Sequence, residues 1–235
     1  VYVVRDFLQE KHIKNKNKGE IYMGIRVYKK PIREYDMESA NVSVLREKDL
    51  ISGEMYLDIM ESPKLTRNKL IGILMRDNKD EDIYNKIKES INEYVDEFII
   101  TNGVSKKDIL ERSHDALFIG GTEDLKFTKF GDYVTFRLKH KYSMMIEFPI
   151  NNEGKVHVKL YKTQNSIVSR YASIDKSHTC FCDLVNLFYF IANDKKVQFL
   201  KELKKFAIKI KNSNTDLIKG VSNTYLCDIL REMPF

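Results

Sequence analysis

Two aspartates in this sequence stand where a divalent cation could be bound. Asp115 lies between two apolar runs, residues 109–110 and 116–119, which predicts two strands joined by a tight turn that carries the carboxylate. Asp36 stands near the end of another predicted strand, residues 32–37. Carboxylates on rigid elements are ligands that Mg²⁺ and Mn²⁺ favour in proteins. If the two aspartates meet, they form a site for two-metal phosphoryl transfer, with ions roughly 4 Å apart.

The cations that such a reaction needs lie between the two aspartates in the sequence. A triphosphate is held by Lys and Arg side chains, usually on a nearby helix. A helix is predicted over residues 64–76, because a Ser-Pro pair typical of helix starts precedes it, and it carries Lys64, Arg67 and Lys69. A solvated helix face is the alternative interpretation of these three side chains.

The acidic residues also have a purely structural interpretation. Asp36 can cap the helix that follows its strand, and Asp115 can simply form the turn, because Asp tolerates the dihedral angles that turns require. His114 can pack against the backbone. In the sequence, Asp36 is followed by the basic helix and then by Asp115. This order makes a metal site as good an interpretation of the two aspartates as a structural role.

Two segments resemble motifs of a known enzyme family. Ser113-His114-Asp115 resembles the third palm motif of family A DNA polymerases and phage-type single-subunit RNA polymerases, where a His-Asp pair sits in a hairpin turn and the aspartate binds metal. The segment Tyr35-Asp36-Met37-Glu38-Ser39-Ala40-Asn41 is similar to the first palm motif, in which an aspartate ends a strand and runs into a helix. The resemblance covers residues 32–120 at most.

The resemblance implies a role for each candidate residue. Its implied metal and catalytic residues are Asp36 and Asp115, with Mg²⁺ or Mn²⁺ as cofactor and His114 beside them. Its implied triphosphate-binding residues are Lys64, Arg67 and Lys69, and Asn41 takes the position that contacts the sugar. The sequence departs from the family in four ways. The basic residues have different spacing, and the fingers region, residues 43–101, is much reduced. Ala116 follows the second aspartate where DNA-polymerising members commonly carry Glu, and Asn41 stands where DNA enzymes carry the Glu that excludes ribose.

The pattern of elements predicts an α+β fold, with a palm-like antiparallel sheet, packed helices and a helical C-terminal region. Residues 80–101 show apolar side chains at helical spacing, and residues 134–138 and 156–160 alternate as strands do. Helices are predicted again over residues 182–192, 195–211 and 222–233. We expect a palm-like domain at residues 1–165 and a thumb-like helical region at residues 166–235.

Charge points to an anionic partner. The chain has 235 residues, a net charge of +6 and a sequence pI of about 9.0. Nucleic acid is the commonest partner of basic proteins. Arg137, Lys139 and Lys141 alternate along a predicted strand and are the candidate contacts to a template or primer backbone, with a basic solvated face as the alternative. The Lys-, Asn- and Ile-rich composition indicates an AT-rich genome, such as that of a phage.

Localisation and extent are also open to prediction from the sequence. No apolar stretch approaches the roughly 20 residues of a membrane helix, so we expect no membrane partner. Three cysteines without zinc-ligand spacing fit a reducing, cytoplasmic setting, which is the host cytoplasm for a phage protein. The chain does not begin with Met, so upstream domains or other replication proteins are further expected partners.

The leading hypothesis is a template-directed nucleotidyltransferase, a DNA or RNA polymerase that uses nucleoside triphosphates. One alternative is a non-catalytic nucleic-acid-binding replication accessory protein with a degenerate palm. Another is a phage structural or assembly protein. A metal-dependent nuclease using Glu38, Asp58 and Glu61 is a third, although these carboxylates show no recognisable nuclease spacing.

Overall fold

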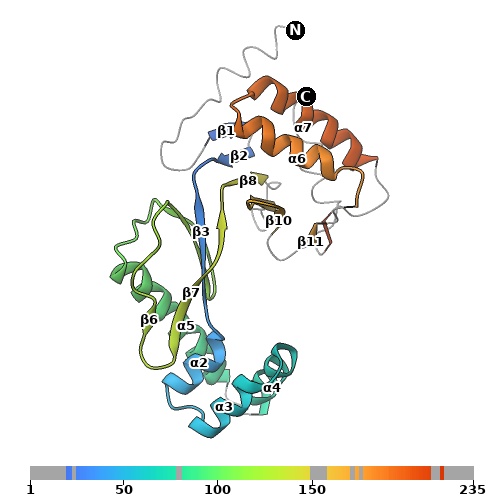
Figure 1. The fold of residues 1–235 in the computed structure, drawn as a ribbon. Coiled ribbons are helices and arrows are strands. Elements are labelled where there is room, and N and C mark those ends of the chain that lie inside the picture. Colours follow the sequence, from blue (N-terminus) through green and yellow to red (C-terminus); the bar gives the residue numbers. More distant parts are fainter. Residues whose placement is uncertain are drawn as a thin grey trace. The chain divides into compact units, whose positions relative to one another are not determined.

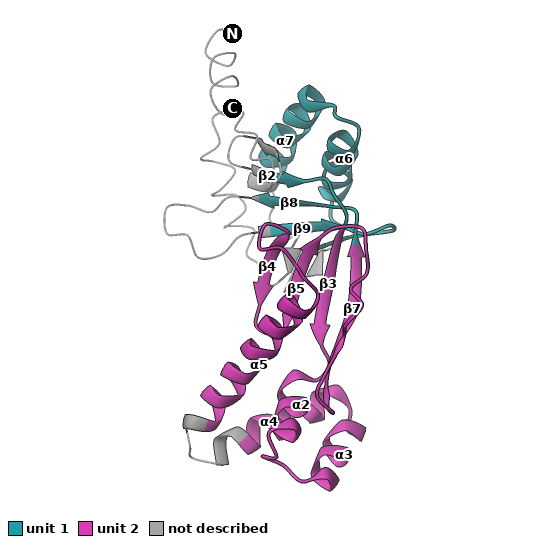
Figure 2. Ribbon diagram, turned by 90° about the vertical axis from the view of Figure 1, so that its left-hand side faces the viewer, with its two compact units in different colours: residues 1–31, 142–235 teal, residues 32–141 magenta. Residues whose placement is uncertain are grey.

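The computed structural model describes residues 20–22, 25–77, 81–148, 158–169, 173–174, 177–212 and 218–219. These residues form two compact units: residues 32–141 make the first described below, and the second combines the chain on either side, residues 1–31 and 142–235 (Figure 2). Helices and antiparallel sheets occur in both units, which confirms the α+β fold class (Figure 1). The assignment of residues 1–165 and 166–235 to a palm and a thumb stays a prediction.

The unit of residues 32–141 is built on a five-stranded sheet with the strand order β4-β5-β3-β7-β6. Its strands are β3 (Ile32–Met37), β4 (Ile109–Ser113), β5 (Ala116–Gly120), β6 (Lys129–Phe130) and β7 (Val134–Tyr142). The predicted hairpin is therefore present as β4–β5, and β5 pairs antiparallel with β3, which carries Asp36.

Helices of this unit fill the connection between β3 and β4. They are α2 (Ala40–Glu47), α3 (Gly53–Glu61), α4 (Lys64–Asp77) and α5 (Glu81–Thr101). Ser52 caps α3 by accepting a 3.1 Å hydrogen bond from the Met55 backbone N–H. Gly103, with φ of +62°, follows the end of α5, as the sequence predicts for a helix stop.

The core of this unit lies between α5 and one face of the sheet, and Figure 2 shows α5 running along the strands. Phe98 of α5 is fully buried and stacks on Phe136 of β7, with ring centroids 4.3 Å apart. Tyr35 and Met37, alternate residues of β3, belong to the same core. Because side chains of a strand alternate between faces, Glu34, Asp36 and Glu38 are left for the opposite face.

The second unit contains the sheet β1-β2-β8-β9-β10 and two helices, with a separate pair of short strands, β11 and β12. The strands are β1 (Glu20–Tyr22), β2 (Ile25–Tyr28), β8 (Met144–Phe148), β9 (Val158–Lys162), β10 (Ile167–Ser169), β11 (Ser173–Ile174) and β12 (Ile218–Lys219). The helices α6 (Phe181–Ala192) and α7 (Lys196–Lys211) pack their apolar faces into one core with β2, β8 and β9.

One sequence-based expectation for this unit changes. The apolar pattern of residues 21–28 predicts a single strand, but β1 and β2 pair with each other in antiparallel fashion, with Tyr22 opposite Ile25. The turn that the sequence Asn-Asn-Glu-Gly predicts at residues 151–154 and the helix predicted over residues 222–233 lie outside the described residues. Within the part of the chain that the structure describes, no helix is both long enough and apolar enough to cross a membrane.

Candidate active site

The pairing of β3 with β5 brings the two predicted aspartates together. Asp36 lies directly opposite Ala116, the residue after Asp115. The ladder continues one step further, because the Met37 backbone N–H donates a 2.9 Å hydrogen bond to the Asp115 carbonyl oxygen. Asp36 and Asp115 are therefore neighbours at the end of the sheet where β3 leads into α2.

Left-handed backbone conformations flank both aspartates. Among the described residues, four non-glycine residues have positive φ, and two of them are His114 at 46° and Ser39 at 47°. His114 immediately precedes Asp115, and Ser39 follows Asp36 by three positions. Such conformations cost free energy in residues other than Gly and Asn, and they concentrate where a side chain must be held in a particular place.

A pocket of about 460 Å³ opens beside the two aspartates. Seven of the predicted site residues line it: Asp36, Asn41, Lys64, Arg67, His114, Asp115 and Arg137. The structure thus gathers residues from β3, α2, α4, the β4–β5 turn and β7 around one space. The other predicted residues, Lys69, Lys139 and Lys141, are not among its lining residues.

Helical periodicity explains which cations of α4 face the pocket. Lys64, Arg67 and Ile71 follow one another at spacings of three and four, which places them on one face of the helix. Lys69 is five positions after Lys64, about 140° around the helix, and it is exposed to solvent elsewhere. Of the three predicted triphosphate-binding residues, the structure therefore brings two to the pocket.

Arg67 is fixed at the pocket wall by a residue of the β3–α2 connection. Its Nη1 donates a 2.6 Å hydrogen bond to the Ser39 hydroxyl and lies 3.5 Å from the Met60 sulfur. Its buried Nε has no hydrogen-bond partner among the described residues. Because Arg67 lines the pocket, its positive charge is suited to an anionic ligand there.

Cations of β7 neutralise the carboxylates of β3. Lys139 Nζ lies 3.1 Å from Asp36 Oδ2 and 3.5 Å from Glu34 Oε1, and Arg137 Nη1 lies 3.6 Å from Glu38 Oε1. The pairs run in opposite directions along the two strands, as antiparallel neighbours require. Two residues predicted to contact nucleic acid therefore hold the carboxylates of the site.

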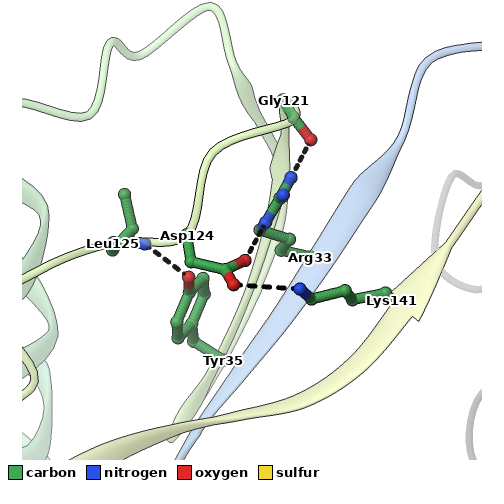
Figure 3. A network of polar contacts seen from close by, with 6 residues as sticks. All are labelled: Arg33, Tyr35, Gly121, Asp124, Leu125 and Lys141. Carbon is green, nitrogen blue, oxygen red and sulfur yellow. Dashed lines mark hydrogen bonds and ion pairs between the residues drawn. The ribbon is translucent and has the colours of Figure 1, made fainter.

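Lys141, the third predicted nucleic-acid contact, belongs to a separate network (Figure 3). Its ammonium lies 2.9 Å from Asp124 Oδ2, and the buried Arg33 donates from Nε to Asp124 Oδ1 at 2.6 Å. Arg33 also donates to the Gly121 carbonyl oxygen, and Tyr35 accepts a 2.7 Å hydrogen bond from the Leu125 backbone N–H. This network ties the loop after β5 to β3 and β7.

Burial and neighbouring charges act on two ionisable groups of the site, Asp115 and Lys139. Partial burial raises the pKa of the Asp115 carboxyl, and the negative charge of Asp36 raises it further. Burial opposes the charge of Lys139, but its contact with Asp36 and the field of Glu34 outweigh this effect and raise its pKa. The folded protein thus opposes the ionisation of Asp115.

The donor set fits a magnesium or manganese ion in part. Mg²⁺ is commonly held by one or two carboxylates together with water and substrate phosphates, and Asp36 and Asp115 supply the two carboxylates. Burial and then the charge of Asp36 raise the pKa of Asp115, and a bound cation would favour its ionised form. In the described part of the chain, no group of three or more His, Cys, Asp or Glu residues is arranged to hold a metal.

Sequence reasoning missed two polar residues of the site. Ser39 contacts Arg67 only because its left-handed backbone turns the chain at the start of α2, and no sequence pattern marks this conformation. Asn68 lines the pocket, and its position four residues after Lys64 is a helical spacing that the sequence does reveal.

Comparison with known proteins places the chain in a phage family. No curated protein matches the sequence. A family model described as the bacteriophage PBS1 gene 130 protein matches residues 6–231. That description agrees with the phage origin indicated by the composition. The match spans nearly the whole sequence, so the chain belongs to the family of the bacteriophage PBS1 gene 130 protein.

Proposed function

We propose that this phage protein is a metal-dependent nucleotidyltransferase that extends a nucleic acid along a template. The observation that carries the proposal is the meeting of Asp36 and Asp115 at a pocket that Lys64 and Arg67 also line. Paired carboxylates and paired cations around one pocket are the groups that phosphoryl transfer from a nucleoside triphosphate requires.

Each residue has a distinct task in this proposal. Asp36 and Asp115 would hold Mg²⁺ or Mn²⁺, which activates the attacking hydroxyl and neutralises charge on the phosphates. Lys64 and Arg67 would bind the triphosphate, and Asn41, which lines the pocket from the first turn of α2, would contact the sugar. His114 sets the hairpin turn that presents Asp115.

Template and primer binding rests on the exposed cations around the pocket. The Arg137 side chain is 57% exposed and only 3.6 Å from Glu38, so a phosphate could replace that carboxylate as its partner. Lys139 and Lys141 already have carboxylate partners at 3.1 and 2.9 Å. A contribution of these two lysines to nucleic-acid binding would require them to exchange those partners for phosphate.

Primer extension with Mg²⁺ or Mn²⁺ tests the proposal. We expect Asp36→Asn and Asp115→Asn each to reduce extension by at least a hundredfold, because each removes a metal ligand while keeping the side-chain shape. Asp58→Asn is the matched control, since Asp58 is an exposed carboxylate on α3 that does not line the pocket. Full activity in either pocket variant would refute the assignment.

The two faces of α4 supply a second, independent test. Arg67→Gln is expected to raise the KM for the nucleoside triphosphate about tenfold or more, because a charge-assisted contact contributes roughly 1.5–3 kcal/mol. Lys69→Gln, on the far side of the helix, is expected to leave that KM within about twofold. Equal effects of the two substitutions would mean that the triphosphate does not occupy this pocket.

A second candidate function is binding of nucleic acid without catalysis. It is favoured by the ion pair between Lys139 and Asp36, which neutralises one of the two carboxylates with a residue of the protein itself. This candidate predicts salt-sensitive binding of primer–template that is independent of divalent cations and unchanged in Asp115→Asn. Metal-dependent extension by the wild-type protein would exclude it.

A further inference from the structure

Lys139 occupies a special position among the cations of the site. Its ammonium lies within 4 Å of two carboxylates, those of Asp36 at 3.1 Å and Glu34 at 3.5 Å. The two carboxylates are largely withdrawn from solvent, with side chains 15% and 9% exposed, whereas the Lys139 side chain is 39% exposed. The acidic partners are fixed in the sheet, and the lysine is the partner with room to move.

The carboxylates of β3 need a positive charge nearby. A carboxylate that leaves water loses much of its hydration free energy unless an opposite charge or hydrogen bonds replace it. Asp36 and Asp115 are neighbours at this end of the sheet and repel each other, and Glu34 lies two residues from Asp36 on the same strand. Lys139 relieves both effects when no other cation is present.

A divalent cation at Asp36 would compete with that ammonium. The same Oδ2 atom of Asp36 that faces Lys139 belongs to the carboxylate that lines the pocket. A +2 ion bound beside a +1 ammonium would be repelled by it, so binding requires the ammonium to withdraw. Glu34, which does not line the pocket, remains as the partner that can receive it.

We propose that Lys139 is an internal counter-ion that exchanges with a divalent cation, moving from Asp36 toward Glu34 when the cation binds at Asp36 and Asp115. This inference rests on the proposed function. Lys139 acts as a positioning residue: it holds the carboxylates in place without metal, and it sets the metal concentration at which the site fills.

The neighbouring lysine of the same strand offers a matched control. Lys141 also forms an ion pair at about the same distance, 2.9 Å, but its partner is Asp124, and neither residue lines the pocket. Removing the charge of Lys141 changes the net charge of the protein by the same amount as removing that of Lys139. Any difference between the two substitutions therefore reports on the local site.

Mn²⁺ binding to the full chain, measured by calorimetry or by the loss of the free-ion spin-resonance signal, tests the inference. Lys139→Gln is expected to bind Mn²⁺ about tenfold more tightly than the wild type, because the competing charge is gone. Lys139→Arg and Lys141→Gln are expected to stay within about twofold of the wild type. Lys139→Met, which keeps the aliphatic stem, is the second neutral variant and should match Lys139→Gln.

Thermal unfolding supplies a readout that does not depend on activity. Without metal, Lys139→Gln should unfold at a lower temperature than the wild type, and saturating Mn²⁺ should raise its Tm by more than it raises that of the wild type. Unchanged or weaker Mn²⁺ binding in both neutral variants would overturn the inference. The proposed function would survive that outcome if the wild type binds Mn²⁺ and Asp115→Asn does not. If neither the wild type nor the neutral Lys139 variants bind Mn²⁺, both the counter-ion inference and the proposed function fail.

Discussion

Asp115→Asn should make the protein more stable, although it removes a residue of the proposed active site. The Asp115 carboxylate is half-buried in the turn between β4 and β5 and faces the charge of Asp36. Both effects raise its pKa, so the folded state opposes its ionisation at neutral pH. Asparagine has nearly the same shape, and its amide oxygen can still accept the hydrogen bond from the residue's own backbone N–H.

The size of the gain follows from the partners of the pair. Lys139 already cancels part of the negative charge of Asp36, at 3.1 Å, so the repulsion that Asp115 feels is reduced but not removed. Correcting one unfavourable charge typically gains about 0.5–2 kcal/mol, and we expect about 1 kcal/mol here. For a chain of this length, that corresponds to a rise in Tm of about 2–4 °C.

A series of melting curves against pH checks both the sign and the cause. A carboxyl whose pKa is raised by folding stabilises the fold while it is protonated and loses that contribution as the pH rises through its folded pKa. The Tm difference between Asp115→Asn and the wild type should therefore be near zero below about pH 4 and grow toward neutral pH. A gain that does not change with pH would point to packing instead of charge.

Asp36→Asn is the contrasting substitution at the same site. This substitution removes the contact between Asp36 and Lys139, so the Tm of Asp36→Asn at neutral pH should not rise, and it should fall if that contact stabilises the fold.

Metal should reverse the order of the Tm values of the wild type and Asp115→Asn. An ion at 100 times its Kd stabilises the wild type by about 2.7 kcal/mol, which exceeds the expected gain of the variant. A lower Tm for Asp115→Asn in EDTA at pH 7 would refute the reasoning.

Three further predictions concern the framework of the site. Gly131→Ala should destabilise the protein by about 2 kcal/mol in chemical denaturation, because φ is +84° there and an added Cβ would lie 2.3 Å from Glu47 Oε1. Asp124→Asn should lower the Tm at neutral pH, because the buried Arg33 loses its carboxylate partner. Hydrogen bonds from Arg33 and Lys141 lower the pKa of Asp124 in the folded protein, so the Tm difference from the wild type should vanish as the pH falls through that folded-state pKa. Phe98→Ala should cost about 3–5 kcal/mol in denaturant unfolding, because a fully buried ring is removed from the core.

The fold class and most helices follow from local sequence patterns. The apolar residues Ile87, Ile91, Val95 and Phe98 recur at helical spacing, and all four are buried in α5 as predicted. The division into β1 and β2 was missed because residues 21–28 are largely apolar, and such a run gives no periodicity that marks where one strand ends and the next begins. Strand order needs long-range pairing, which a local pattern does not contain.

The candidate site was predictable in its residue types and less so in its geometry. Asp115 is identifiable because only five residues, 111–115, separate the apolar runs 109–110 and 116–119, and so short an interruption is typical of two strands joined by a tight turn. Lys69 does not line the pocket, and sequence spacing alone does not say which face of α4 lies beside it. The pairing of Lys139 with Asp36 depends on β7 lying beside β3, a neighbour that is distant in the sequence.

The structural interpretation of the aspartates, as a helix cap and a turn former, explains less of the molecule than the site does. Ser39, and not Asp36, occupies the cap position of α2, and its hydroxyl binds Arg67 instead of the helix N-terminus. A turn former gains nothing from facing a second carboxylate, yet Asp115 faces Asp36 and is opposed by it. Local strain at His114 and Ser39 adds to this cost. Features that destabilise the fold are expected to gather at one pocket when the binding of a cation and an anionic substrate there compensates for their cost. Metal binding is therefore the first property to test.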